Sequence, residues 1–292
     1  MDKYIKQFIE KYKNLLADED FTSLYRKAYK EMTGYPYIGS LTQIFLDLDI
    51  DPLDYMSKIP TGYLASAAVK SVDIPDHITS IGMNAFNECK SLTSITIPDS
   101  VTSIGEWAFK DCSSLTGVVI GSSVATIGRE AFCNCRGLTS IEIPSGVTSI
   151  EDSVFYNCYS LTSVAIPDSV TSIRNMAFCK CSSLTSIEIP NSVTTIGDNA
   201  FGDCSSLTSI EIPNSVTTIG GAAFGDCSGL QNITIPDSVT SIGYATFSGC
   251  SSLTNINFKG TTSQWGEIKK DEDWKKYSSL KAIFCTDGDL KP

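Results

Sequence analysis

Cysteine is the residue type in this chain with the most obvious chemical potential. Eleven cysteines occur in 292 residues, and eight of them recur every 23 residues. These eight are Cys89, Cys112, Cys135, Cys158, Cys181, Cys204, Cys227 and Cys250. A column of equivalent cysteines gives each member two equal neighbours, which favours core packing over specific disulfide pairs. We expect reduced thiols, because the sequence as given starts without a secretory leader.

Two cysteine pairs have the close spacing of metal ligands. They are Cys133 with Cys135 and Cys179 with Cys181. The two pairs lie 46 residues apart, so they would be separated by two repeats and roughly 10 Å. Zinc needs four ligands within about 2.3 Å of one ion, and one member of each pair belongs to the core column. We expect no metal and no other cofactor, with Cys133 and Cys179 as exposed thiols.

Catalytic residue sets are not evident. The single histidine, His77, lies near the first repeat turn and has no second histidine to support it. A Ser-His-Asp arrangement needs such a base beside its nucleophile. Glu188 and Glu211 are one repeat apart, near 5 Å, a distance compatible with glycosidase carboxylates. They should lie on an open, solvated surface rather than in an enclosed site, so we expect no enzyme activity.

The elements that position these residues form a repeat. Three apolar columns share the 23-residue period, namely phenylalanine, cysteine and a leucine three residues after each cysteine. The phenylalanines are Phe86, Phe109, Phe132, Phe155, Phe178, Phe201, Phe224 and Phe247. A fixed period between 20 and 50 residues is typical of a solenoid, in which each unit buries its apolar face against its neighbours.

Each unit is predicted to contain two extended segments and a turn. In the Phe224 unit, Ile210 and Ile212 alternate with polar residues, as in a half-buried strand. Pro213 ends that strand, because proline cannot donate to a ladder. Residues 216–219 form a second extended segment, and residues 223–227 form a helical or 3₁₀ turn. Stacked units should build a parallel sheet with strands about 4.8 Å apart.

The two ends depart from the period, so we predict three parts. Residues 1–61 form a helical N-terminal cap, since their apolar residues recur at three-and-four spacing. Residues 62–258 form the solenoid, a half-repeat followed by eight 23-residue repeats. Subtracting 23 from the first full repeat aligns Tyr63 with the phenylalanine column and Ser66 with the cysteine column. Residues 259–292 form a mixed α/β C-terminal cap that covers the last coil.

The net charge of the chain limits the classes of partner that we expect. The formal net charge is −11, and residues 76–258 supply most of it. An acidic surface repels phosphate backbones, so we expect a protein partner and no direct binding of nucleic acid. No segment suits a membrane span, and we expect no membrane insertion. We expect a monomer that is cytoplasmic as given, or secreted or surface-located if a leader has been trimmed.

One stretch of the repeat resembles a known family. Residues 97–115 read I-P-D-S-V-T-S-I-G-E-W-A-F-K-D-C-S-S-L, and this phrase is similar to the unit of BspA-like, Treponema pallidum-type leucine-rich repeat proteins. The resemblance implies an α/β fold, a right-handed leucine-rich-repeat solenoid with a parallel β-sheet. It also implies non-catalytic binding, because the family is best known for bacterial surface proteins that bind host or matrix proteins.

Residues that vary while the frame stays constant are the candidate binding residues. The outward strand column comprises Thr96, Val119, Glu142, Ala165, Glu188, Glu211, Thr234 and Asn257. A second variable ridge follows each glycine turn, and Trp107 and Tyr244 are its expected exposed aromatic anchors. Two alternatives remain open. One is an intracellular acidic inhibitor, for instance of phage origin, that occupies a basic groove on a nucleic-acid enzyme. The other is a carbohydrate-binding or carbohydrate-active solenoid.

Overall fold

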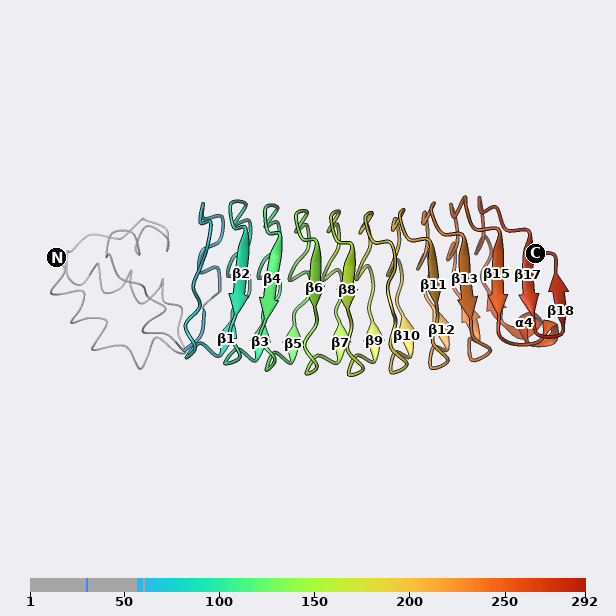
Figure 1. Ribbon diagram of the computed structural model, residues 1–292, viewed down its shortest axis with the longest axis horizontal. Helices are drawn as coiled ribbons and strands as arrows, with labels where there is room; N and C mark the ends of the chain where they lie inside the picture. The colour runs from blue at the N-terminus through green and yellow to red at the C-terminus, as the bar shows by residue number, and fades with distance from the viewer. Residues whose placement is uncertain (1–29, 31–56, 60) are drawn as a thin grey trace.

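The computed structural model describes residues 30, 57–59 and 61–292. The predicted helical cap of residues 1–61 lies almost wholly outside these described residues. The described chain is a parallel β-solenoid whose coils follow one another along a single axis (Figure 1). Most coils contribute one short strand to a second sheet, then a turn, and then one longer strand to a first sheet.

The outer surface of the first sheet is called the strand face below. Its strands are β2 (Ser94–Ile97), β4 (Gly117–Ile120), β6 (Ser140–Glu142), β8 (Ser163–Ala165), β11 (Ser209–Glu211), β13 (Asn232–Ile235), β15 (Asn255–Phe258), β17 (Ala282–Cys285) and β18 (Gly288–Leu290). Repeat strands pair in parallel at the 23-residue period, as in Ser94↔Gly117, within three ladders, β2–β4, β6–β8 and β11–β13–β15. No ladder is formed at residues 186–188, so the strand expected around Glu188 is wrong, although Ile187 and Ile189 remain buried.

The second sheet consists of two-residue strands. They are β1 (Ser80–Ile81), β3 (Ser103–Ile104), β5 (Thr126–Ile127), β7 (Ser149–Ile150), β9 (Ser172–Ile173), β10 (Thr195–Ile196), β12 (Thr218–Ile219), β14 (Ser241–Ile242) and β16 (Lys269–Lys270). The isoleucine of each repeat strand points into the core, while the preceding serine or threonine stays nearer to solvent. The sequence predicted this second extended segment at residues 216–219 of the Phe224 unit, and the strand β12 occupies its last two residues.

The third side of each coil is a turn rather than a helix, and it is also tied to its neighbour. Two residues per turn adopt positive φ, for example Trp107 (57°) and Asp111 (61°). A left-handed backbone is unfavourable for such residues. Here it directs their N–H groups to the next coil, where Trp107 N donates to Arg129 O at 3.0 Å and Asp111 N donates to Cys133 O at 2.8 Å. The strain is therefore offset by hydrogen bonds between coils.

The core is a continuous stack of eight phenylalanine rings. Neighbouring rings have centroids 5.1–5.8 Å apart and planes within 3–12° of parallel. The ends of the stack differ from its interior, because Tyr63 meets Phe86 edge-on at 85° and Trp274 meets Phe247 edge-on at 80°. All eight phenylalanines are fully buried, as predicted.

The cysteine column lies beside this stack. Each thiol Sγ donates a hydrogen bond to a carbonyl of the preceding coil, as in Cys204 to Phe178 O at 3.2 Å. The other seven make the same contact at 3.0–3.2 Å. The prediction that Cys133 and Cys179 are exposed is wrong, since they are only 4% and 5% exposed. Cys133 and Cys179 occupy the same position in their coils, and Tyr156 occupies that position in the coil between them. Side chains at this position pack between neighbouring coils.

The first described coil is one residue shorter than predicted. The bridge Ile59↔Ile81 and the bond from Cys89 Sγ to Leu64 O place this coil 22 residues before the next one, not 23. Ala67, rather than Ser66, therefore aligns with the cysteine column, and Ser66 takes a positive φ of 62°. Within the described residues, the contacts between coils include Ser57, whose O accepts the N–H of Thr79.

The C-terminal segment forms a further coil with an insertion. Strand β16 pairs with β14 at an offset of 28 residues, and β17 pairs with β15 at 27. Helix α4 (Thr262–Glu267) begins with a capping box between Thr261 and Gln264. Its Trp265 packs edge-on against Phe258 at 5.1 Å and against Trp274 at 6.0 Å. The segment thus contains both helix and strands, and it packs aromatic rings over the end of the core.

The glycine that starts each turn is required by close stacking of the coils. A Cβ atom placed on Gly220 would lie 2.5 Å from Gly197 C, and one on Gly128 would lie 2.6 Å from Glu106 N. Two successive coils nevertheless replace this glycine, with Glu151 and Arg174. At Arg174 the ladder is kept, because Arg174 N donates to Ile150 O at 2.9 Å. At Glu151 it is lost, since β5 and β7 belong to separate sheets.

The interface between the Phe132 and Phe155 coils is therefore open on one side. The strand-face ladder β6–β8 is intact there, but within the described chain the amides of Thr148 and Glu151 lack the bonds made by their equivalents Thr171 and Arg174. The phenylalanine spacing is also widest at this interface, at 5.8 Å. The opening coincides with the first of the two glycine replacements, Glu151, whereas Arg174 brings the same Cβ atom to the next interface and keeps its ladder.

Amide exchange should report this opening. We expect the amides of Thr148 and Glu151 to exchange with solvent about fivefold faster than those of Thr171 and Arg174, because a missing hydrogen bond removes about 1 kcal/mol of local protection. Hydrogen–deuterium exchange followed by NMR would measure all four amides in one sample. Equal protection would mean that the β5–β7 ladder closes in solution.

Candidate binding surfaces

The outward strand column forms one continuous surface on the strand face. Seven of its eight predicted residues are exposed, and Thr234 is half-buried. The column continues beyond the repeats to Phe284, which pairs with Asn257 and is 39% exposed. Sequence reasoning missed Phe284 because the 27-residue offset hides it from the period. The best available signal was the apolar strand pattern of residues 280–285.

The chemistry of this surface changes along its length. Val119 near the first coils is 61% exposed, and Phe284 provides an apolar side chain at the other end. Between them lie the three glutamates. Glu211 is paired with Lys259 at 2.6 Å, whereas Glu142 and Glu188 make no ion pair with any described residue. The surface therefore presents two unpaired carboxylates between apolar ends.

The ridge on the turn side is less uniform than predicted. Tyr244 is 57% exposed. Trp107 is only half-buried rather than exposed, and its indole Nε1 is enclosed near the Glu130 carboxylate, outside ordinary hydrogen-bond geometry. Its left-handed backbone turns the residue into the interface between coils. Trp107 is therefore a weaker candidate for a binding anchor than Tyr244.

Two of the functions considered from the sequence, metal binding and membrane insertion, can be compared with the described residues. Among residues 30, 57–59 and 61–292, no cluster of three or more His, Cys, Asp or Glu side chains is arranged to hold a metal ion. Within the same ranges, no helix has the length and apolar character needed to cross a membrane.

Comparison with known proteins identifies a family whose repeat matches this solenoid. The model of the "BspA type Leucine rich repeat region (6 copies)" family matches residues 57–185 and 172–269, well over half of the chain. No curated protein matches.

Several solved bacterial structures are similar to the chain. A leucine-rich cell surface protein from Faecalibacterium prausnitzii is 30% identical over 74% of this chain and 86% of its own, with a TM-score of 0.42. The T. pallidum leucine-rich repeat protein is 26% identical over 69% and 77%, with a TM-score of 0.34. A Bacteroides ovatus leucine-rich repeat protein is 25% identical over 74% and 82%, with a TM-score of 0.35. From the matched family model and the repeat geometry, the chain belongs to the BspA-type leucine-rich repeat family.

Proposed function

We propose that this chain is a non-catalytic repeat protein that binds a protein partner through its strand face. The observation that carries the proposal is the contrast between columns. The inward phenylalanine, cysteine and leucine columns are constant and fully buried, while the outward strand column is exposed and changes from coil to coil. A rigid frame with a variable open surface suits recognition of an extended protein surface.

The charge distribution supports a basic partner. Residues 181–258 contain six acidic side chains and no lysine, arginine or histidine. The six are Glu188, Asp198, Asp203, Glu211, Asp226 and Asp237. Opposite charges on a partner would speed its association and make affinity depend on salt. The apolar residues Val119 and Phe284 supply contact area at the two ends of the same face.

Charge reversal on the strand face tests the proposal. Once a partner has been isolated with the immobilised protein, we expect Glu142→Lys and Glu188→Lys each to weaken its affinity about tenfold, equivalent to about 1.4 kcal/mol. Both carboxylates are exposed and unpaired within the described chain, so neither change should disturb folding. Biolayer interferometry at two salt concentrations would measure the dissociation constants.

The matched controls are Asp168→Lys and Asp237→Lys. These exposed residues lie at the corners between the two sheets and carry the same charge change away from the strand face. We expect both controls to bind with nearly wild-type affinity. Equal losses in all four variants would show a general charge effect, and unchanged affinity for Glu142→Lys and Glu188→Lys would remove the strand face from the proposal.

A further inference from the structure

A hollow lies at the edge where the second sheet passes into the turns. It is lined by Asp152, Ser172, Ile173, Arg174, Asn175, Thr195 and Gly197. These residues come from three successive coils, and the volume is about 330 Å³. That is at the lower end of the range for small-molecule sites. The hollow is on a different side of the coil from the strand face, so it is independent of the proposed protein-binding surface.

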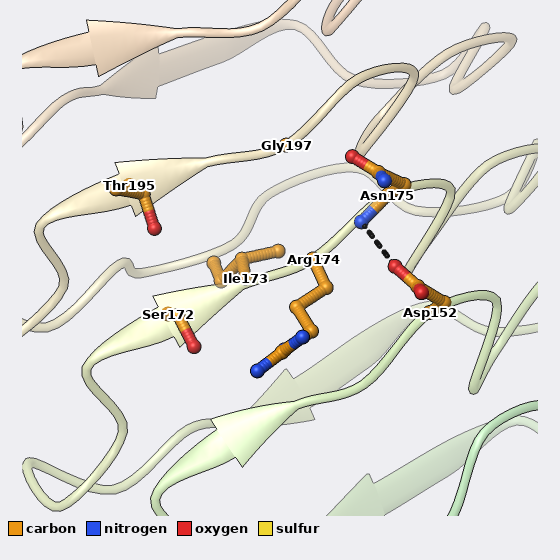
Figure 2. A pocket seen from close by; sticks show the side chains of 7 residues that line it. All are labelled: Asp152, Ser172, Ile173, Arg174, Asn175, Thr195 and Gly197. Carbon is orange, nitrogen blue, oxygen red and sulfur yellow. Dashed lines mark hydrogen bonds between the residues drawn. The ribbon is translucent and has the colours of Figure 1, made fainter.

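The hollow lies where the glycine that starts most turns is replaced in two successive coils. Arg174 stands where most coils have glycine, and its long side chain forms one wall (Figure 2). The guanidinium Nε lies 3.2 Å from Ser149 Oγ and 3.3 Å from Glu151 Oε2. Its two terminal nitrogens make no hydrogen bond within the described part of the chain. Arg174 is thus oriented by its neighbours while it keeps free donors.

A second wall, beside Arg174, is also fixed in place. Asp152 Oδ1 accepts the backbone N–H of Asn175 at 3.0 Å, and Asn175 Oδ1 accepts that of Asp198 at 2.9 Å. Figure 2 shows Asp152 and Asn175 side by side and joined by the first of these bonds. Each bond uses one side-chain atom, so Asp152 Oδ2 and Asn175 Nδ2 are left without a partner among the described residues. The wall therefore offers one acceptor and one donor of set direction.

The polar groups indicate the class of ligand. The lining carries one positive charge, on Arg174, and one negative charge, on Asp152. A simple anion would face Asp152 and the nearby Glu151, and a simple cation would face Arg174. Ile173 is fully buried, so no apolar side chain is offered to a lipid or an aromatic ring. A neutral molecule rich in hydroxyl groups fits best, because each hydroxyl both donates and accepts hydrogen bonds.

We infer that this hollow is a binding site for a neutral saccharide. Arg174 donates to sugar hydroxyls through its terminal nitrogens, while Asp152 accepts from them and Asn175 donates to them. Thr195, which is exposed at the rim, supplies a further hydroxyl. The site binds the sugar and does not react with it. Binding comes from fixed donors and acceptors that match the hydroxyl groups of the ligand.

Saccharide titrations test the inference. Saturation-transfer difference NMR with mannose, galactose, N-acetylglucosamine and their β-linked disaccharides should detect at least one ligand of the full chain. Arg174→Gly restores the residue of most other coils and should fold normally, and we expect it to weaken that binding at least tenfold. Arg174→Lys keeps the charge but removes the planar fork, so we expect it to weaken binding as well.

The controls separate this site from the strand face. Glu142→Lys should leave saccharide binding unchanged, and acetate or phosphate at equal concentration should not compete with the sugar. Absence of binding to every saccharide would overturn the inference. Undiminished binding by Arg174→Gly, with its fold verified by circular dichroism, would also overturn it, and so would full displacement of the sugar by acetate.

Discussion

Raising the pH from 7 to about 10 is expected to unfold the solenoid. The reason is the cysteine column, whose thiols are buried and donate hydrogen bonds as neutral groups. Burial raises the pKa of Cys250 to about 12 and that of Cys89 to about 11. It also raises the pKa of Cys135, Cys158 and Cys181 well above the ordinary value. Ionisation is therefore opposed in the folded chain.

The sign of the effect follows from proton linkage. A thiol whose pKa is higher in the folded state contributes its full stability below the unfolded pKa of about 8.5, and loses it as the pH rises toward the folded value. Each pH unit above about 8.5 costs about 1.4 kcal/mol per buried cysteine. The seven column cysteines from Cys112 to Cys250 would together lose roughly 10 kcal/mol per unit, comparable with the whole stability of a typical domain.

Urea unfolding followed by circular dichroism between pH 7 and pH 10 would measure this loss. A single Cys204→Ser variant is the matched test, because the serine hydroxyl keeps a donor for Phe178 O but does not ionise in this range. Above pH 8.5 its unfolding should release one proton fewer than unfolding of the wild type. Its unfolding free energy should therefore fall less steeply as the pH rises. Stability that stays flat between pH 8 and pH 10, in both proteins, would contradict the argument.

Replacing one phenylalanine of the stack should have the largest effect of any single substitution. Phe178 is fully buried between Phe155 and Phe201, with ring centroids at 5.5 and 5.4 Å. We expect Phe178→Ala to lower the free energy of unfolding by about 3–5 kcal/mol, through lost apolar burial and the cavity that remains. Since each coil contacts only its neighbours, the loss should also divide unfolding into two steps.

Thermal and urea denaturation would measure both consequences. Tyr159→Ala is the control, because Tyr159 is another aromatic residue of the same region but is 41% exposed. We expect that control to change stability by less than about 0.5 kcal/mol. A loss below about 1 kcal/mol in Phe178→Ala, or a single sharp transition with full loss, would argue against nearest-neighbour coupling of the coils.

The periodic columns made most of the solenoid predictable. An inward column repeats because one short coil cannot bury its own apolar face, so Phe201 and its equivalents give both the period and the core. The exposed outward residues followed from the same alternation. This argument gives side-chain direction, and it gives little about how far apart two coils settle or which of them lose a ladder bond.

The wrong predictions arise where the outcome depends on how two neighbouring coils pack against each other. The first described coil is shorter by one residue, since Ile59 pairs with Ile81, and the sequence columns alone do not reveal which residue is skipped. Trp107 and Cys133 were expected at the surface because they lie in variable columns, but on the turn side the coils pack so closely that such columns are partly or wholly buried. The Arg174 hollow was missed because the broken glycine column was not treated as a signal.

The direction of β18 has a consequence for assembly. It pairs antiparallel with β17, whereas every other described ladder is parallel. A further coil stacked in the parallel register of the repeats would meet a strand that runs the other way, with Asp289 exposed. The parallel ladder of the repeats therefore ends at β17, and β18 offers an edge of different direction and charge to any chain that packs against it.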